Sequence, residues 1–367
     1  MKNACIILKK KVTASDAGAS AVLDAFFMRG YPFDEIRILM QENEQRAREC
    51  IAELKKEAEI VLLLADKTAL PIAKRYSSEA FPESSMQNSF GAAGIYYDQN
   101  RTLLLLSADE TETGVGYVKN ACIPHLQRQS GVRYDSITLR AVGANEGRVE
   151  GLLSQARKMS DGRMNFARVR KYDEDVLEIT YDCNVPKMLI DDVLRLFADG
   201  LGDTVYALDD TTLEEQLVNA LKVRRKKISV AESFTGGGIA RRLTSVSGAS
   251  EIYFEGLNTY DEKSKIQRLG VTEYTLKTLG AVSDQTAYEM AYGLLNTGNC
   301  DVAIATTGLA GPKSDRSGQP VGLCYLAVGT RERIRVYRYI FDGSRKEITE
   351  KAINYALFYA YRQVKDL

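Results

Sequence analysis

The chain has 367 residues, and its 49 Lys and Arg balance its 49 Asp and Glu, which gives a formal net charge of zero. This balance argues against nucleic acid as a dedicated partner, because nucleic-acid-binding proteins carry a surplus of basic residues. With 45% hydrophobic residues, and at roughly 150 residues per domain, the chain predicts a globular protein of two or three domains.

Cysteine and histidine usage predicts neither a disulfide framework nor a metal site. The six cysteines are far apart, without a C-x-x-C pair, and His125 is the only histidine. No stretch approaches the roughly 20 apolar residues of a membrane span. The apolar run that follows Met1 is also too short for a signal peptide. We therefore expect a cytoplasmic protein without a metal, a cofactor or a membrane partner.

The first part, residues 1–133, alternates short apolar runs with helical patterns. Strands are expected at 4–8, 35–40, 59–65 and 101–107, and helices at 20–31, 43–57, 68–76 and 116–129. This order predicts a parallel sheet with helices on both faces, which is a three-layer α/β/α sandwich.

The rhythm changes in residues 134–208. Strands are expected at 135–143, 165–172, 175–182 and 204–208, and helices at 147–159 and 185–202. This pattern predicts a small α+β module between the two larger parts.

The last part, residues 209–367, returns to an α/β pattern and begins with a helix whose capping box is Thr212 and Glu215. Strands are expected at 228–232, 251–260, 300–308, 321–329 and 333–341, and further helices at 237–246, 283–298 and 344–364. We predict a second α/β/α sandwich.

Small and polar residues directly follow three of these strands. The stretches cover 233–238, 258–265 and 306–312. In an open α/β sheet such positions meet at the carboxyl edge, where ligands bind, and glycines there let the backbone approach a phosphate. Taken singly, Ser233 and Thr235 suit helix capping, Tyr260 suits a strand anchor and Lys265 suits a solvated helix face. Their ordered recurrence after strands favours a shared ligand site.

The sequences VAESFTGGGIARRLTSVSGASEIYFEGLNTYDEKSKIQRLGV, LGAVSDQTAYEMAYGLL and ATTGLAGPKSDRSGQPVGLCYLAVG, within residues 209–367, resemble the C-terminal domain of the CinA family. The resemblance implies a nicotinamide-nucleotide amidohydrolase that converts nicotinamide mononucleotide to nicotinic acid mononucleotide and ammonia. It also implies that the three loops meet at one nucleotide pocket, and that the protein is a homodimer.

Three family motifs, E-S-x-T-G-G, Y-x-x-x-x-K and T-G-x-A-G-P, mark the site residues that the resemblance implies. They fall on Glu232, Ser233, Thr235, Gly236, Gly237, Tyr260, Lys265, Thr307, Gly308, Ala310, Gly311 and Pro312. The chain departs from the family at Lys313, Ser314 and Asp315, where a glycine-rich run is usual, and at Leu323, where Thr is usual. These departures bear on substrate affinity and on the phosphate contacts.

Hydrolysis of a carboxamide needs a nucleophile, a base and donors for the oxyanion. We expect Ser233 to be the nucleophile and Lys265 the base, because a lysine in a closed pocket can lose its proton near neutral pH. Tyr260 would relay the proton or orient the lysine. The sequence leaves open whether the backbone of Thr235 and Gly236 serves the oxyanion or the phosphate. The residues expected to bind substrate are Glu232, Thr235, Gly236, Gly237, Thr307, Gly308, Ala310 and Gly311.

The full-length family carries an N-terminal domain that resembles molybdopterin-binding proteins and in some members hydrolyses ADP-ribose with a divalent metal. Here both glycine loops of that chemistry are missing, and Asp66 is the carboxylate left at the second loop. Residues 1–133 therefore predict a degenerate scaffold or dimerisation domain. The stretch ITLRAVGANEGRVEGLL resembles the family's connector and opens a KH-like module, whose missing G-x-x-G loop favours packing over RNA binding.

Two alternatives stay open at this stage. One is a catalytically silent nucleotide-binding or protein-binding relative linked to competence, which the missing N-terminal loops and the Lys313 to Asp315 departure favour. The other is residual ADP-ribose pyrophosphatase activity in residues 1–133.

Overall fold

The computed structural model describes residues 2–10, 17–82, 93–98, 101–109, 111–130, 134–314 and 318–367. Arg133, at the first predicted boundary, and Asp315 lie outside these residues. By their contacts the residues divide into two compact units, the first with 1–137, 153–169 and 177–194 and the second with 138–152, 170–176 and 195–367. The domain boundaries at 133 and 208 remain predictions.

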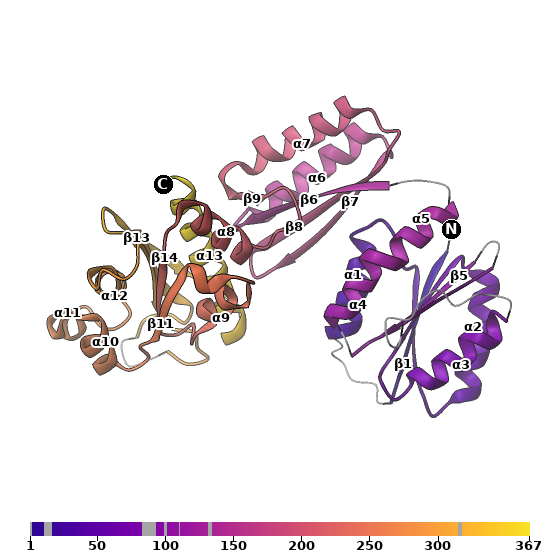
Figure 1. Cartoon of the computed structure of the whole chain (residues 1–367), viewed down its shortest axis with the longest axis horizontal. Coiled ribbons are helices and arrows are strands. Elements are labelled where there is room, and N and C mark those ends of the chain that lie inside the picture. Colours follow the sequence, from indigo (N-terminus) through magenta and orange to yellow (C-terminus); the bar gives the residue numbers. More distant parts are fainter. Residues whose placement is uncertain are drawn as a thin grey trace. The chain divides into compact units, whose positions relative to one another are not determined.

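A five-stranded sheet in the order β2-β1-β3-β5-β4 forms the core of the first unit (Figure 1). Its strands are β1 (Asn3–Lys9), β2 (Glu35–Met40), β3 (Ile60–Ala65), β4 (Gly94–Tyr97) and β5 (Thr102–Ser107). Helices α2 (Glu44–Glu57) and α3 (Leu70–Ala80) pack on one face, and α1 (Ala17–Phe27), α4 (Thr111–Tyr117) and α5 (Ile123–Ser130) pack on the other. A π-helical turn, Val118–Cys122, joins α4 to α5. The predicted three layers are present, and the antiparallel edge strand β4 was too short to be predicted from periodicity.

The segment that lies between the two sandwiches in the sequence forms a four-stranded sheet in the order β7-β8-β6-β9. Its strands are β6 (Tyr134–Val142), β7 (Met164–Lys171), β8 (Glu174–Asp182) and β9 (Val205–Ala207), and a 3₁₀ turn (Gly202–Thr204) precedes β9. Helices α6 (Glu146–Ser160) and α7 (Lys187–Leu201) lie on one face of this sheet (Figure 1). The α+β composition predicted for this module is therefore confirmed.

The third sheet has the order β11-β10-β12-β13-β14 and lies in the second unit. Its strands are β10 (Ile228–Glu232), β11 (Tyr253–Asn258), β12 (Val302–Gly308), β13 (Leu323–Thr330) and β14 (Ile334–Ile340). Strands β11, β10 and β12 are parallel, and β13 and β14 are antiparallel additions.

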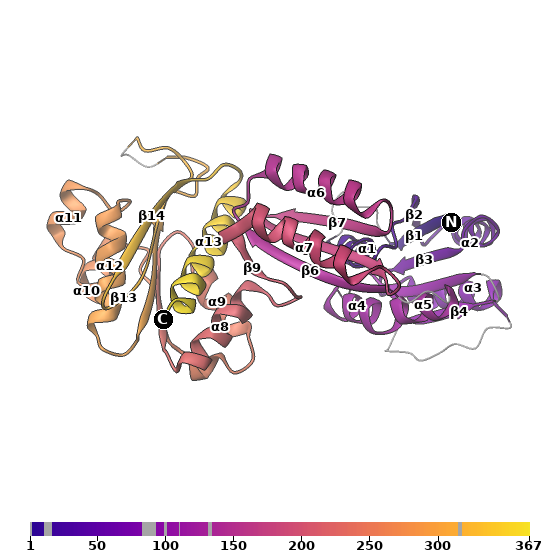
Figure 2. The same cartoon turned by 90° about the horizontal axis from the view of Figure 1, so that it is seen from above.

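Helices cover both faces of the third sheet, so the predicted α/β/α class is confirmed. One face carries α8 (Leu213–Arg224), α9 (Gly238–Ser245) and α13 (Arg345–Lys365). The other carries α10 (Glu262–Leu269), α11 (Glu273–Thr278) and α12 (Asp284–Asn296), and a 3₁₀ turn (Ala249–Glu251) precedes β11. Figure 2 shows the sheet between α12 and α13.

Two further features of the described residues bear on the sequence expectations. None of the described helices is long and apolar enough to cross a membrane. All six cysteines are free thiols, of which five are buried and Cys183 is exposed.

Candidate functional site

The three polar stretches meet at one edge of the third sheet, as their positions after strands predicted. Strands β10, β11 and β12 are parallel neighbours, and Glu232 at the end of β10 is paired with Asn258 of β11 and Thr306 of β12. Their carboxyl ends therefore lie side by side. The loops that begin at Ser233, Thr259 and Leu309 leave the sheet from that common edge.

A buried side-chain contact joins the first and second of these loops, from Lys265 to Ser233. Lys265 lies in the first turn and a half of α10, and its Nζ donates to Ser233 Oγ at 3.2 Å. The same Nζ donates to the carbonyl oxygens of Thr259 at 2.7 Å and Tyr260 at 3.3 Å. Lys265 is 1% exposed and Ser233 is 8% exposed, so this pair is shielded from bulk water.

Burial changes the acid strength of this lysine. The loss of solvation lowers the pKa of Lys265 below its usual 10.5, because an ammonium is disfavoured away from water. The nearby carboxylates of Glu262 and Asp261 act in the opposite direction but are weaker than the burial. A lowered pKa and a serine hydroxyl within reach are the two properties that a lysine base requires.

The glycine turn after β10 is held by Glu232. Its carboxylate accepts hydrogen bonds from the backbone N–H groups of Gly237 at 3.1 Å, Ile239 at 3.1 Å and Ala240 at 2.8 Å. A carboxylate at this position satisfies free donors and complements the dipole of α9. The anion at the start of α9 is therefore an internal one, and the substrate-binding role of Glu232 remains a prediction.

The turn itself needs its glycines. Gly236 and Gly237 have φ of +62° and +91°, in the left-handed region that favours glycine. The N–H of Gly236 donates to the carbonyl of Ser233 at 3.1 Å, which closes the turn. The N–H of Gly236 is therefore already hydrogen-bonded within the turn. The sequence, which predicted that it would bind an oxyanion or a phosphate, did not reveal this contact.

Buried threonines tie the end of β12 to the segments around it. The hydroxyls of Thr235 and Thr306 share a hydrogen bond of 2.7 Å, and Thr307 donates to the carbonyl of Ala281 at 2.6 Å. Thr306 was not among the predicted site residues, although its place before the T-G-x-A-G-P motif was a signal for it. The first bond ties the loop after β10 to the end of β12, and the second ties β12 to the segment between α11 and α12.

The third loop is closely packed against β13. A Cβ on Gly308 would lie 2.6 Å from the Cβ of Cys324, so glycine is required there. Gly311 has φ of +78° and its Cβ position faces Val321. Ala310, predicted to bind substrate, is 3% exposed and belongs to the core. The predicted residues of this loop thus shape the edge of the site.

Tyr260 lies at the exposed rim of the site, beside a residue that the sequence did not point to. Its side chain is 63% exposed, and its hydroxyl accepts a hydrogen bond from Arg345 Nη2 at 3.2 Å. Arg345 Nη1 donates to the carbonyl of Gly311 at 2.8 Å. Tyr260 therefore meets Lys265 through its backbone carbonyl, and both roles that the sequence suggested for it remain predictions.

The corresponding edge of the first sheet is organised differently. The carboxylate of Asp66 accepts from the N–H groups of Lys10 at 2.7 Å, Thr68 at 3.1 Å and Ala69 at 2.9 Å. Asp109 accepts from the N–H of Lys67 at 2.6 Å. These carboxylates shape the loops of the first sheet. Among the described residues no group of His, Cys, Asp and Glu has an arrangement that could hold a metal ion.

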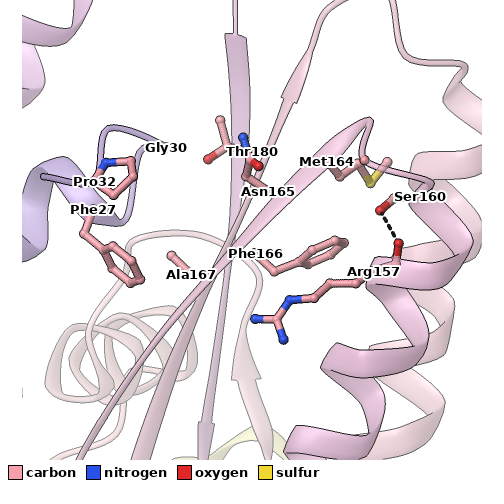
Figure 3. Close-up of a pocket in the computed structure, with 11 residues that line it drawn as sticks. Phe27, Gly30, Pro32, Arg157, Ser160, Met164, Asn165, Phe166, Ala167 and Thr180 are labelled. Carbon is pink, nitrogen blue, oxygen red and sulfur yellow. Dashed lines mark hydrogen bonds between the residues drawn. The ribbon is translucent and has the colours of Figure 1, made fainter. Parts of the chain in front are cut away.

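A cavity of about 510 Å³ lies in the first unit, and Figure 3 shows its lining. It is lined by Phe27, Gly30, Pro32, Arg157, Ser160, Gly162, Met164, Asn165, Phe166, Ala167 and Thr180. None of the predicted site residues is in this lining, so the cavity is separate from the Ser233 site.

Comparisons with known proteins agree with these motifs. Residues 210–364 match a family model described as the CinA C-terminal domain. A protein of Caldicellulosiruptor saccharolyticus named as competence-damage inducible is 37% identical over 282 residues, which are 75% of this chain and 68% of that protein. A CinA-like protein of Kosmotoga olearia is 31% identical over 77% of this chain and 69% of its own length. A crystal structure of a CinA superfamily protein from Klebsiella pneumoniae, 30% identical, covers 42% of this chain and 97% of its own, with a TM-score of 0.41.

Proposed function

Because the chain belongs to the CinA family of competence-damage inducible proteins, we propose that its second unit hydrolyses nicotinamide mononucleotide to nicotinic acid mononucleotide and ammonia. The observation that carries the proposal is the buried contact between Lys265 Nζ and Ser233 Oγ at 3.2 Å. The contact supplies a nucleophile and a base, and the choice of substrate follows from the family resemblance of the three motifs.

The hydrogen bonds of Lys265 support its role as the base. A neutral amine has two N–H donors and one lone pair, whereas an ammonium has three donors. The ammonium form donates to Ser233 and to the carbonyls of Thr259 and Tyr260. Once Lys265 is neutral, the two carbonyls take its two remaining donors, and its lone pair can accept from the Ser233 hydroxyl. The positive pyridinium ring of the substrate further favours the neutral lysine.

The proposed reaction has two stages. Ser233 Oγ attacks the carboxamide carbon while Lys265 takes the hydroxyl proton; the C–N bond of the tetrahedral intermediate then breaks, and the lysine returns the proton to the leaving ammonia. A water molecule next attacks the acyl-serine ester while Lys265 takes one of its protons. The bond between the acyl carbon and Ser233 Oγ then breaks, the lysine returns the proton to Oγ, and the acid that is released ionises to the carboxylate as the ammonia becomes ammonium. Water is the one co-reactant, and the serine and the lysine are regenerated.

Arg345 is the cation that suits the phosphate of the mononucleotide. It is exposed at the rim of the site, and guanidinium groups match the geometry of phosphate oxygens. The start of α9, the other place where a phosphate would bind, is occupied by the Glu232 carboxylate. The exposed ring of Tyr260, held by Arg345, provides an aromatic surface next to that cation.

The test is release of ammonia and formation of nicotinic acid mononucleotide by the full chain with EDTA present. We expect turnover in the wild type and in Ser245→Ala, a matched change of an exposed serine at the end of α9. We expect loss of turnover in Ser233→Ala and Lys265→Ala, with unfolding midpoints showing that both variants are folded. A folded wild-type chain without turnover, or a folded Ser233→Ala variant with full turnover, would refute the proposal.

A further inference from the structure

A single arginine joins α9 to two other helices. The side chain of Arg242 is 15% exposed, its Nη1 donates to Asn354 Oδ1 at 2.5 Å, and its Nη2 donates to Glu214 Oε2 at 2.5 Å. Asn354 lies in α13 and is 3% exposed, and Glu214 lies in the first turn of α8. The guanidinium therefore holds α9 to α8 and α13 through two partly buried polar contacts.

The other end of α9 is packed just as closely. A Cβ on Gly238, its first residue, would lie 2.4 Å from the Cδ1 of Ile353, which precedes Asn354 in α13. The helix is two turns long, so Gly238 and Arg242 are one turn apart on the face that meets α13. Contacts at both turns leave α9 little freedom to rotate or slide.

The link extends from Asn354 to the hairpin between β7 and β8. Asn354 Nδ2 donates to the backbone carbonyl of Tyr172 at 2.8 Å. Tyr172 and Asp173 have φ of +53° and +60°, and the carbonyl of Asp173 accepts from the N–H of Gly143 at 2.8 Å. The left-handed turn and this second bond set the direction in which the Tyr172 carbonyl points.

We propose that Glu214, Arg242 and Asn354, here called the α9 clamp, position Ser233 for the reaction proposed above, and that the β7–β8 hairpin completes the clamp. The inference rests on the proposed function. These are positioning residues, since they act through α9, in which the N–H groups of Ile239 and Ala240 donate to Glu232, the residue before Ser233.

The geometry explains why such positioning matters. Ser233 follows β10 next to α9, whereas Lys265 belongs to α10 on the opposite face of the sheet. Their Oγ to Nζ distance is 3.2 Å, which is already at the long end for a hydrogen bond. A shift of α9 by a fraction of an ångström would lengthen that contact, and displacement by about 1 Å costs on the order of a hundredfold in rate.

The first experiment compares Arg242→Ala with Arg241→Ala in the full chain. Arg241 is the next residue of α9, with a side chain that is 71% exposed and a distant ion pair to Glu350 at 3.9 Å, so it is a matched control. We expect kcat of Arg242→Ala to fall about tenfold or more with KM within about threefold. We expect Arg241→Ala to stay within about twofold of the wild type.

A second variant, Asn354→Asp, separates the hairpin from the rest of the clamp. An aspartate still accepts from Arg242, but it has no N–H for the Tyr172 carbonyl and opposes it with a second acceptor. We expect kcat to fall about threefold to tenfold, because the hydrogen bond that it removes is a neutral one. Wild-type kcat in Asn354→Asp would remove the hairpin from the proposal.

Hydrogen exchange at Ile239 and Ala240 gives a readout that does not depend on turnover. We expect faster exchange of these amides in Arg242→Ala and unchanged exchange in Arg241→Ala. If the wild type has no deamidase activity, the exchange data still test the clamp, and the proposed function fails separately. A folded Arg242→Ala chain with wild-type kcat, or with wild-type exchange at both amides, would overturn the proposal. If Arg242→Ala does not fold, Arg242→Lys takes its place and is judged by the same two measurements.

Discussion

At the scale of single residues, the site depends on a lysine that is buried beside a serine. Its Nζ contacts one hydroxyl and two carbonyls but no carboxylate at ion-pair distance among the described residues. A buried ammonium without a paired anion is costly, and this cost is what lowers the pKa of Lys265. The burial that makes Lys265 a base therefore also destabilises the folded chain while the lysine is charged.

This cost predicts a pH dependence of stability. The folded pKa of Lys265 lies below its usual 10.5, so between the two values the unfolded chain binds more protons than the folded chain. The free energy of unfolding should therefore rise with pH across that window. Urea unfolding at a series of pH values should show this rise in the wild type and in Lys263→Met, which changes an exposed neighbour. In Lys265→Met the rise in the free energy of unfolding should be smaller, because the contribution of Lys265 is absent. Parallel pH profiles for the wild type and Lys265→Met would contradict the prediction.

A second residue-scale prediction concerns Arg345. If its guanidinium binds the substrate phosphate, Arg345→Ala removes one charge-assisted interaction and should raise KM about tenfold or more, with a smaller change in kcat. The adjacent exposed lysine provides the control, since Lys346→Ala should leave KM within about twofold. Steady-state kinetics on both variants decide the matter, and equal KM values in the two would rule out this role.

At the scale of elements, the sequence predicted where the loops lie but not how they are used. Periodicity and strand order placed the three polar stretches at one sheet edge, and the structure brings Ser233 and Lys265 together there. The capping role of Glu232 was not predicted. Glu232 and Ser233 are neighbours at the end of β10, and the sequence alone favoured the serine as the cap of α9. The contact of Arg345 with Tyr260 spans 85 residues, and no local pattern encodes a contact of that range.

The role of Glu232 in α9 leads to a prediction at this scale. Glu232→Gln keeps the size of the side chain but removes the charge and turns one acceptor into a donor that faces backbone N–H groups. We expect a loss of about 1–2 kcal/mol in the free energy of unfolding, measured with urea. Glu273→Gln, which removes a 2.7 Å surface pair with Lys277, should cost about 0.5 kcal/mol or less. A Glu232→Gln loss no larger than this would show that the cap is unimportant.

At the scale of the whole molecule, the alternation of apolar and helical segments was sufficient to predict both sandwiches and the smaller sheet. That success has a physical reason for the sandwiches, since their central strands are covered by helices on both faces and are therefore continuously apolar. The hydrogen bond between Asn354 and Tyr172 could not be predicted from the sequence. Its acceptor is a backbone carbonyl, which every residue has, so no residue type marks its position. Contacts of this kind appear once the fold has placed the segments.

The same view of the whole chain predicts that the Asp66 loop can be weakened without affecting the site. Asp66 accepts from three backbone N–H groups of the first unit, so Asp66→Ala should destabilise that unit by about 1–3 kcal/mol. The contacts that hold Ser233 and Lys265 all belong to the second unit. We therefore expect Asp66→Ala to lower the midpoint of an unfolding transition while kcat and KM for nicotinamide mononucleotide stay within about twofold. A proportionate loss of turnover in the folded variant would show that the first unit takes part in the reaction.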